Sequence, residues 1–265
     1  MSRVQSVLQK VRRIAASDLE HIDKLRYVLH AGRPSSAPIA YRLRGGISVE
    51  LRPGTTDSKV FDEIFIEQAY APCVALLPAD LGPVTLIDLG ANIGLSALFL
   101  TRVLKVVEFI AVEPDPDNFR LLSENLRRNG WADRCTAIRA FAGGEHAFAD
   151  LLDSGNGAWG LRMGPWSEFG TPVLPLAHIA GAAKTSAPLI LKCDIEGGEH
   201  QLFLHIRDWE HLVPYILLEL HTEFLPGEEL LACLESSCFE WIVHGTAPAG
   251  AAIAMLLLER GAPKG

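Results

Sequence analysis

Short apolar runs alternate with amphipathic segments along most of the chain, beginning near residue 84. The runs are nearly continuous in Val, Ile and Leu, which is typical of parallel strands that are buried on both faces of a sheet. The segments between them carry apolar residues at helical spacing. This alternation indicates an α/β fold in which helices cover both faces of a mostly parallel sheet. The expected strands are 84–90, 108–114, 135–141, 188–195, 215–221, 239–245 and 252–260, and the expected helices are 94–104, 116–129, 198–206 and 228–237.

The last two expected strands are joined by the short link GTAPAGA. A parallel connection needs a crossover of a dozen or more residues, so this link is too short for one. One of these two strands should therefore run antiparallel to the rest of the sheet.

The segment before residue 79 has a different pattern. Apolar residues lie at helical spacing through the first thirty residues and form one stripe, which would cover the main domain or pair with a second subunit. Two strand-like pieces separated by Gly45-Gly46 predict a small hairpin, and 57–72 reads as a helix. We therefore expect an N-terminal extension over 1–78 and the α/β domain over 79–265.

Composition and charge restrict the partners. The chain has 265 residues, of which 49% are hydrophobic, and a formal net charge of −8. A negative charge of this size argues against nucleic acid or an anionic bilayer as a partner. No apolar stretch approaches the ~20 residues needed to span a membrane, and no signal peptide is visible. The five cysteines form no CxxC pair, which favours a reducing cytoplasm.

The sequence IDLGANIGLS places a glycine-containing turn between the first strand and its helix. Gly90 allows a tight turn next to a ligand, and Gly94 allows close packing of helix on strand. Glu113 ends the next strand, 19 residues after Gly94, where doubly wound folds place a carboxylate that binds ribose hydroxyls. A dinucleotide site normally has GxGxxG, but Asn92 occupies the position of its second glycine. The loop thus suits a cofactor without phosphates, S-adenosylmethionine, whose amino-acid end could use Asp88, while a dinucleotide stays the alternative.

Five segments carry a family resemblance: 52–70, 87–100, 111–129, 191–203 (LKCDIEGGEHQLF) and 217–221. On these segments the chain resembles the FkbM family of S-adenosylmethionine-dependent methyltransferases; the first fifty residues carry no match. The resemblance implies a Rossmann-like class I methyltransferase sheet of order 3-2-1-4-5-7-6 with one antiparallel strand. It also implies that Asn92 holds the amino-acid end of the cofactor, and that Phe141 and Ala142 lie where adenine stacks.

Polar side chains gather where two neighbouring strands end. Asp194 lies at the end of strand 188–195 and Glu196 directly after it, and with Lys192 they alternate at period two, so all three should face one way if the strand persists that far. Glu219 and His221 end strand 215–221. Ligands bind at this edge of such sheets, so these groups should meet the methyl acceptor. Asp194 also belongs to the expected cofactor site. We take Asp194 and His221 as candidate general bases, with Glu196 and Glu219 as orienting groups or ligands of a divalent metal, although the prediction commits to no metal ion.

Two further segments are expected to shape the site. The glycine-rich stretch 155–166 reads as an irregular loop whose Trp159 and Trp166 line an acceptor pocket. Asp57 and Tyr70 are expected to reach over the cofactor as a lid.

The prediction is therefore an S-adenosylmethionine-dependent O-methyltransferase that releases S-adenosylhomocysteine and acts on a sugar, glycolipid or polyketide-type metabolite. Three alternatives stay open: an N-acceptor, a dinucleotide-dependent oxidoreductase, and a non-catalytic binding or scaffold protein.

Overall fold

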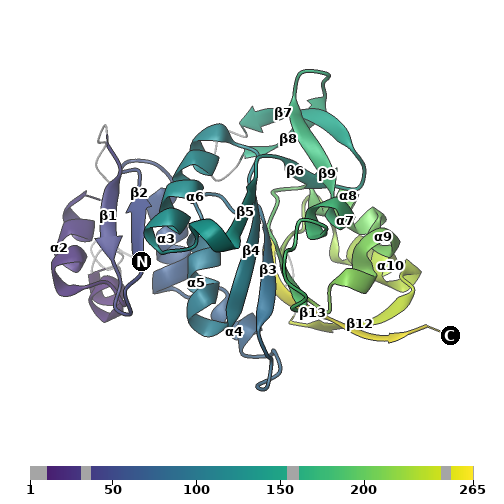
Figure 1. Cartoon of the computed structure of the whole chain (residues 1–265), viewed down its shortest axis with the longest axis horizontal. Helices are drawn as coiled ribbons and strands as arrows, with labels where there is room; N and C mark the ends of the chain where they lie inside the picture. The colour runs from purple at the N-terminus through teal and green to yellow at the C-terminus, as the bar shows by residue number, and fades with distance from the viewer. Residues whose placement is uncertain (1–10, 31–36, 154–160, 246–251, 265) are drawn as a thin grey trace.

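A seven-stranded sheet forms the centre of the computed structural model, which describes residues 11–30, 37–153, 161–245 and 252–264 (Figure 1). Its spatial order is β12-β13-β11-β10-β3-β4-β5. β13 runs antiparallel to both of its neighbours, β11 and β12, and all other neighbouring strands of this sheet pair parallel, so the observed order and the antiparallel strand match the prediction. The strands are β3 (Val84–Leu89), β4 (Val106–Val112), β5 (Cys135–Ile138), β10 (Leu189–Cys193), β11 (Tyr215–His221), β12 (Phe239–His244) and β13 (Ile253–Pro263).

The sheet separates two hydrophobic cores. Along β3, Leu86 belongs to one core, whereas Ile87 and Leu89 belong to the other. This is the period-two alternation of a strand, here with both faces apolar. The first core packs against α5 (Leu95–Val103) and α6 (Pro116–Arg128), and the second against α7 (Leu176–Ala180), α8 (Glu199–Leu204), α9 (Ile206–Trp209) and α10 (Gly227–Ser236).

A second sheet was not anticipated. The predicted strand 135–141 is wrong in its last part, because β5 ends at Ile138 and Phe141 starts a new strand. Phe141 packs with Ala149 and Val173, which belong to the second sheet. This sheet has the order β6-β9-β7-β8 and stands together at one side of the molecule (Figure 1). Its strands are β6 (Phe141–Gly143), β7 (Ala147–Asp153), β8 (Leu161–Trp166) and β9 (Thr171–Pro175).

The irregular loop expected over 155–166 is corrected for 161–166, and its first part, 155–160, lies outside the described residues. Residues 161–166 form the edge strand β8, which pairs with β7 and with no other strand of the described residues. The Gly164-Pro165 pair reads as a turn in sequence, but an edge strand tolerates proline because its outer N–H groups need no partner. Trp166 is 63% exposed and does not line the cavity described below, whereas Met163 of the same strand does. Trp159 lies outside the described residues.

The N-terminal extension contains the expected hairpin and an unexpected helix face. β1 (Ile39–Arg42) and β2 (Ser48–Leu51) pair antiparallel, as predicted. The single apolar stripe covers the core only in part: Ile14 and Leu19 are buried in the first core, whereas α2 (His21–His30), which begins after a break at 17–20, leaves Ile22 64% exposed. Asp23 and Tyr27 are buried instead, and Tyr27 donates its hydroxyl hydrogen bond to the Ser58 carbonyl or Asp62 carboxylate. Pairing of the stripe with a second subunit stays a prediction.

The helix expected over 57–72 is divided into three parts. α3 (Asp57–Phe61) continues into a π-helical turn, Asp62–Ile66, and α4 (Ala71–Val74) follows. The wide turn buries Ile64 and Phe65 in the first core and leaves Glu63 lining the cavity. Within the part of the chain that the structure describes, no helix is both long and apolar enough to cross a bilayer.

Candidate active site

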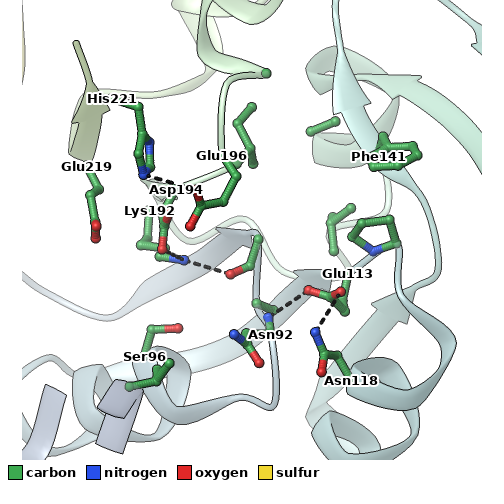
Figure 2. A pocket seen from close by; sticks show the side chains of 18 of the residues that line it. Asn92, Ser96, Glu113, Asn118, Phe141, Lys192, Asp194, Glu196, Glu219 and His221 are labelled. Carbon is green, nitrogen blue, oxygen red and sulfur yellow. Dashed lines mark hydrogen bonds and ion pairs between the residues drawn. The ribbon is translucent and has the colours of Figure 1, made fainter. Parts of the chain in front are cut away.

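A cavity of about 460 Å³ opens at the carboxyl ends of β3, β4, β10 and β11 (Figure 2). It has two parts, which we name here. The glycine-loop half is lined by Gly90, Asn92 and Glu113, which Asp88 supports from behind, and the strand-end half by Asp194, Glu196, Glu219 and His221. Of the predicted site residues, the cavity is lined by Gly90, Asn92, Glu113, Phe141, Ala142, Asp194 and His221. Asp88 and Gly94 lie behind its wall.

The two halves meet at Gly90. This residue has a φ of +70°, and a Cβ placed on it would lie 1.7 Å from the Asp194 carbonyl oxygen. No other residue fits there without moving the two strand ends apart. Asn92 also adopts a left-handed conformation, with φ +48°, which Asn tolerates better than most residues. At Gly94, with φ +87°, a Cβ would approach the Leu122 side chain to 2.9 Å, so this glycine sets the packing of α6.

A buried ion pair supports the glycine loop from behind. Lys192 Nζ lies 3.1 Å from Asp88 Oδ1 and within 3.2 Å of the Leu89 and Gly90 carbonyl oxygens. Burial by itself would lower the pKa of Lys192, but Asp88 above all raises it well above its usual range. Ser96 donates a second hydrogen bond to Asp88 at 2.7 Å. Asp88 thus holds the loop in place from behind, and its predicted contact with the amino-acid end of the cofactor stays a prediction. Lys192 had been assigned no role from the sequence.

The Glu113 carboxylate is buried and held by donors. Its Oε2 accepts from the backbone N–H of Asn92 and its Oε1 from that of Asp115, both at 2.9 Å. Asn118 adds a longer bond of 3.4 Å. Burial raises the pKa of Glu113 to about 7, although the two backbone donors oppose the rise. A carboxylate has about four lone-pair sites, so acceptor capacity is left for a ligand.

Asn118 connects the cavity to the N-terminal extension and was missed in the sequence. Arg52 Nη2 donates to Asn118 Oδ1 at 2.6 Å, and Arg52 is itself paired with the buried Asp57 at 2.8 Å. The available signal was the D-P-D-N stretch, in which Asp115 caps α6 through the Asn118 N–H. Of the two expected lid residues, Tyr70 lines the cavity and Asp57 holds Arg52 behind it.

In the strand-end half, a buried glutamate positions His221. His221 Nδ1 lies 2.9 Å from Glu199 Oε1, and Glu199 is completely buried. Glu199 also accepts from the backbone N–H groups of Ile195 and Gly197, which fixes its position. Burial by itself would lower the pKa of His221, but Glu199, Asp194 and Glu196 together raise it to about 9. Glu199 had no expected role, although the E-G-G-E block contained it.

The remaining carboxylates of this half lie close together. Glu196, at φ +50°, places Oε2 3.5 Å from His221 Nε2, and burial raises its pKa to about 7. The predicted alternation of Lys192, Asp194 and Glu196 along one strand ends early, because β10 stops at Cys193, yet all three line the cavity. Burial, together with Asp194 and Glu63, raises the pKa of Glu219 well above its usual range.

The charge of the cavity wall selects among ligands. Six carboxyl groups line it against one lysine and one histidine: Glu63, Glu113, Asp194, Glu196, Glu219 and Glu223 on one side, Lys192 and His221 on the other. Such a wall attracts a cation and repels a pyrophosphate. The cavity therefore disfavours the dinucleotide alternative, in agreement with the incomplete GxGxxG pattern.

Comparison with known proteins places this chain among methyltransferases. A family model described as the methyltransferase FkbM domain matches residues 88–261, and the chain belongs to this family. The chain is 32% identical over 93 residues to methyltransferase sdnD of Sordaria araneosa, covering 35% of this chain and a third of that protein. Two solved structures are similar, both at TM-score 0.46: methyltransferase FkbM from Methylobacillus flagellatus KT and M. jannaschii TYW2 in complex with AdoMet. The match to the first is 20% identical and covers 70% of this chain and 45% of the other chain. The match to the second is 13% identical and covers 86% of this chain and 87% of the other chain.

The cofactor of this class is S-adenosylmethionine, and the cavity fits it. Its sulfonium and ammonium groups are cationic and match the acidic wall, and its ribose hydroxyls match the remaining acceptor sites of Glu113. Phe141 on β6 lies on the Glu113 side of the cavity (Figure 2), and Ala142 also lines the cavity. Their place beside the adenine stays a prediction.

Proposed function

We propose that this protein transfers the methyl group of S-adenosylmethionine to a hydroxyl oxygen of a small-molecule acceptor, such as a sugar, a glycolipid or a polyketide. The observation that supports this most is the junction at Gly90. It brings a half suited to the cofactor against a half that contains a histidine held by a buried glutamate. Methyl transfer is a displacement that depends mainly on the alignment of donor and acceptor, and a common wall provides that alignment.

In this proposal the glycine-loop half binds the cofactor. Glu113 accepts from the ribose hydroxyls, Asn92 and the backbone around Gly90 hold the amino-acid end, and Phe141 and Ala142 flank the adenine. When bound, S-adenosylmethionine supplies an activated methyl group on a positively charged sulfur, and S-adenosylhomocysteine remains after transfer.

The strand-end half handles the acceptor proton. His221 Nε2 and the Asp194 carboxylate are the groups assigned to take the proton that the hydroxyl loses when its oxygen bonds to the methyl carbon. With a pKa of about 9, His221 carries its own proton at neutral pH when the cavity holds no ligand. A cation bound beside it favours the neutral imidazole. Ligand binding would thus prepare the base.

Calorimetric titration with S-adenosylhomocysteine tests the cofactor site, with NAD as the competing ligand. We expect binding of S-adenosylhomocysteine alone, weakened at least tenfold, or about 1.4 kcal/mol, by Glu113→Ala. Glu223→Gln is the matched control, because it removes an exposed carboxylate from the same wall.

Each alternative predicts a different result. Binding of NAD without S-adenosylhomocysteine would support the oxidoreductase, and binding of neither ligand would refute the proposal and favour a scaffold. If S-adenosylhomocysteine binds, a screen of hydroxyl and amine acceptors with labelled S-adenosylmethionine separates O-methylation from N-methylation, and transfer only to amines would overturn the hydroxyl assignment.

A further inference from the structure

Three donor atoms in the strand-end half face one another. Asp194 follows β10, and Glu219 and His221 lie two residues apart on the adjacent β11, so the alternation of the strand directs both to one face. One carboxylate oxygen of Asp194, one of Glu219 and one ring nitrogen of His221 all lie within 4.8 Å of one another. Figure 2 shows these side chains converging on the same part of the cavity.

The Glu219 carboxylate has no partner among the residues that the structure describes. Its residue is only 9% exposed, yet within the described part of the chain it forms neither a hydrogen bond nor an ion pair. An isolated buried carboxylate is costly, so such groups are normally paired or bound to a metal. Because Glu219 also lines the cavity, its partner is expected to come from outside the chain.

His221 has the arrangement of a metal-binding histidine. Histidines that bind metals usually donate the N–H of their other ring nitrogen to a carboxylate, which fixes the tautomer and the ring orientation. Glu199 is the carboxylate at Nδ1 of His221, and two backbone N–H groups hold Glu199 in position. The Nε2 atom is thereby left facing Glu196 and the cavity.

Lys192 forms only a long ion pair with the third member, Asp194. Lys192 Nζ lies within 3.2 Å of three oxygens, namely Asp88 Oδ1 and the carbonyl oxygens of Leu89 and Gly90. Asp194 Oδ2 is farther away, at 3.4 Å. Three ammonium protons therefore already have closer acceptors. The side chain of Asp194 is also 25% exposed, which leaves it accessible to a ligand from the cavity.

We infer that Asp194, Glu219 and His221 bind a divalent cation of the oxygen-preferring class, such as Mn²⁺ or Mg²⁺. Two carboxylates and one imidazole are acceptable donors for Mn²⁺, and they leave the other positions of an octahedron for water and an acceptor oxygen.

The inference rests on the proposed function for its chemical purpose and refines one assignment. A cation at this place would lower the pKa of a coordinated hydroxyl, whose proton would leave to water in the cavity as the oxygen bonds to the methyl carbon. Asp194 and His221 would then act on the acceptor through the metal instead of as free bases. An acceptor with a second oxygen next to the methylated hydroxyl would then be favoured, because it can chelate the cation.

Titration of the full chain with Mn²⁺ alone tests the site. Calorimetry measures the heat of binding, and electron paramagnetic resonance measures the Mn²⁺ that stays free. We expect saturable binding of one Mn²⁺ per chain. Glu219→Gln and Asp194→Asn should each weaken it at least tenfold, whereas Glu223→Gln should change it by no more than about threefold, as for an exposed charge. Circular dichroism verifies that the variants are folded, and Asp194→Asn is the milder change because that side chain is partly exposed.

The inference is overturned if no saturable binding occurs, or if Glu219→Gln and Asp194→Asn bind Mn²⁺ as tightly as the native chain. A parallel titration with S-adenosylhomocysteine in the presence of EDTA separates this result from failure of the proposed function. Binding of S-adenosylhomocysteine without any Mn²⁺ binding would refute the metal site alone. The carboxylates would then stabilise the positively charged sulfonium of the cofactor. Glu219→Gln would weaken the binding of S-adenosylmethionine more than that of S-adenosylhomocysteine, whose sulfur is uncharged.

Discussion

The two halves of the cavity treat buried charge in opposite ways. In the glycine-loop half each buried charge has a partner: Asp88 pairs with Lys192, and Glu113 accepts from two backbone N–H groups. In the strand-end half Asp194, Glu196 and Glu219 lie around one histidine, and Glu219 has no partner within the described chain.

This difference indicates what each half has to do. A charge that the fold already compensates gives a rigid wall, which suits a cofactor bound in the same way at every turnover. A charge that the fold leaves uncompensated is available for a ligand and destabilises the protein until that ligand arrives. The following changes are designed to break or sharpen this contrast.

Lys192→Met should have the largest effect, because it breaks the compensated half. The variant leaves the fully buried Asp88 without its cation, and removal of one partner of a buried pair costs about 3–5 kcal/mol. Urea unfolding followed by circular dichroism measures the loss. The exposed Lys184→Met is the matched control and should stay within about 0.5 kcal/mol. A loss below about 1 kcal/mol for Lys192→Met would show that the pair does not stabilise the loop.

A change of pH should produce the next largest effect, on cofactor binding. Burial raises the pKa of Glu113 to about 7, so the carboxylate is mostly ionised at pH 8 and mostly protonated at pH 6. The ionised form accepts from hydroxyls at both oxygens, and the affinity for S-adenosylhomocysteine should therefore fall as the pH decreases. If only that form binds, the loss from pH 8 to pH 6 is about tenfold. Calorimetry at both values measures it, and a pH dependence that persists in Glu113→Gln would assign the effect to another group.

The main sheet could be predicted because its signals are local. Both faces of β3 are apolar, so Leu86 and Ile87 indicate a buried parallel strand even when the residues that pack against them are unknown. The convergence of Asp194, Glu219 and His221 follows from strand ends that meet at one edge.

The rest depends on distant contacts. The burial of Tyr27 on α2 relies on acceptors at Ser58 and Asp62, which are 31 and 35 positions away. β6 pairs with β9, and β7 and β8 lie between these two strands in the sequence. Without knowledge of this distant pairing, Phe141 reads in sequence as the continuation of β5. The role of Glu199 appears only when α8 and β11 are packed together, because His221 lies 22 positions further along the chain.

Glu219→Gln should have the smallest effect and the opposite sign. Asp194 and Glu63 repel the Glu219 carboxylate, and no group of the described residues bonds to it, so an uncharged side chain of nearly the same shape removes a repulsion. Urea unfolding at pH 8 in the presence of EDTA should show an increase in the free energy of unfolding on the order of 1 kcal/mol. Saturating Mn²⁺ should make the native chain the more stable of the two. The cation binds the folded native chain tightly and raises its free energy of unfolding, whereas it binds the variant only weakly. If the variant is less stable than the native chain even in EDTA, Glu219 already has a favourable environment, and the contrast between the two halves would not hold.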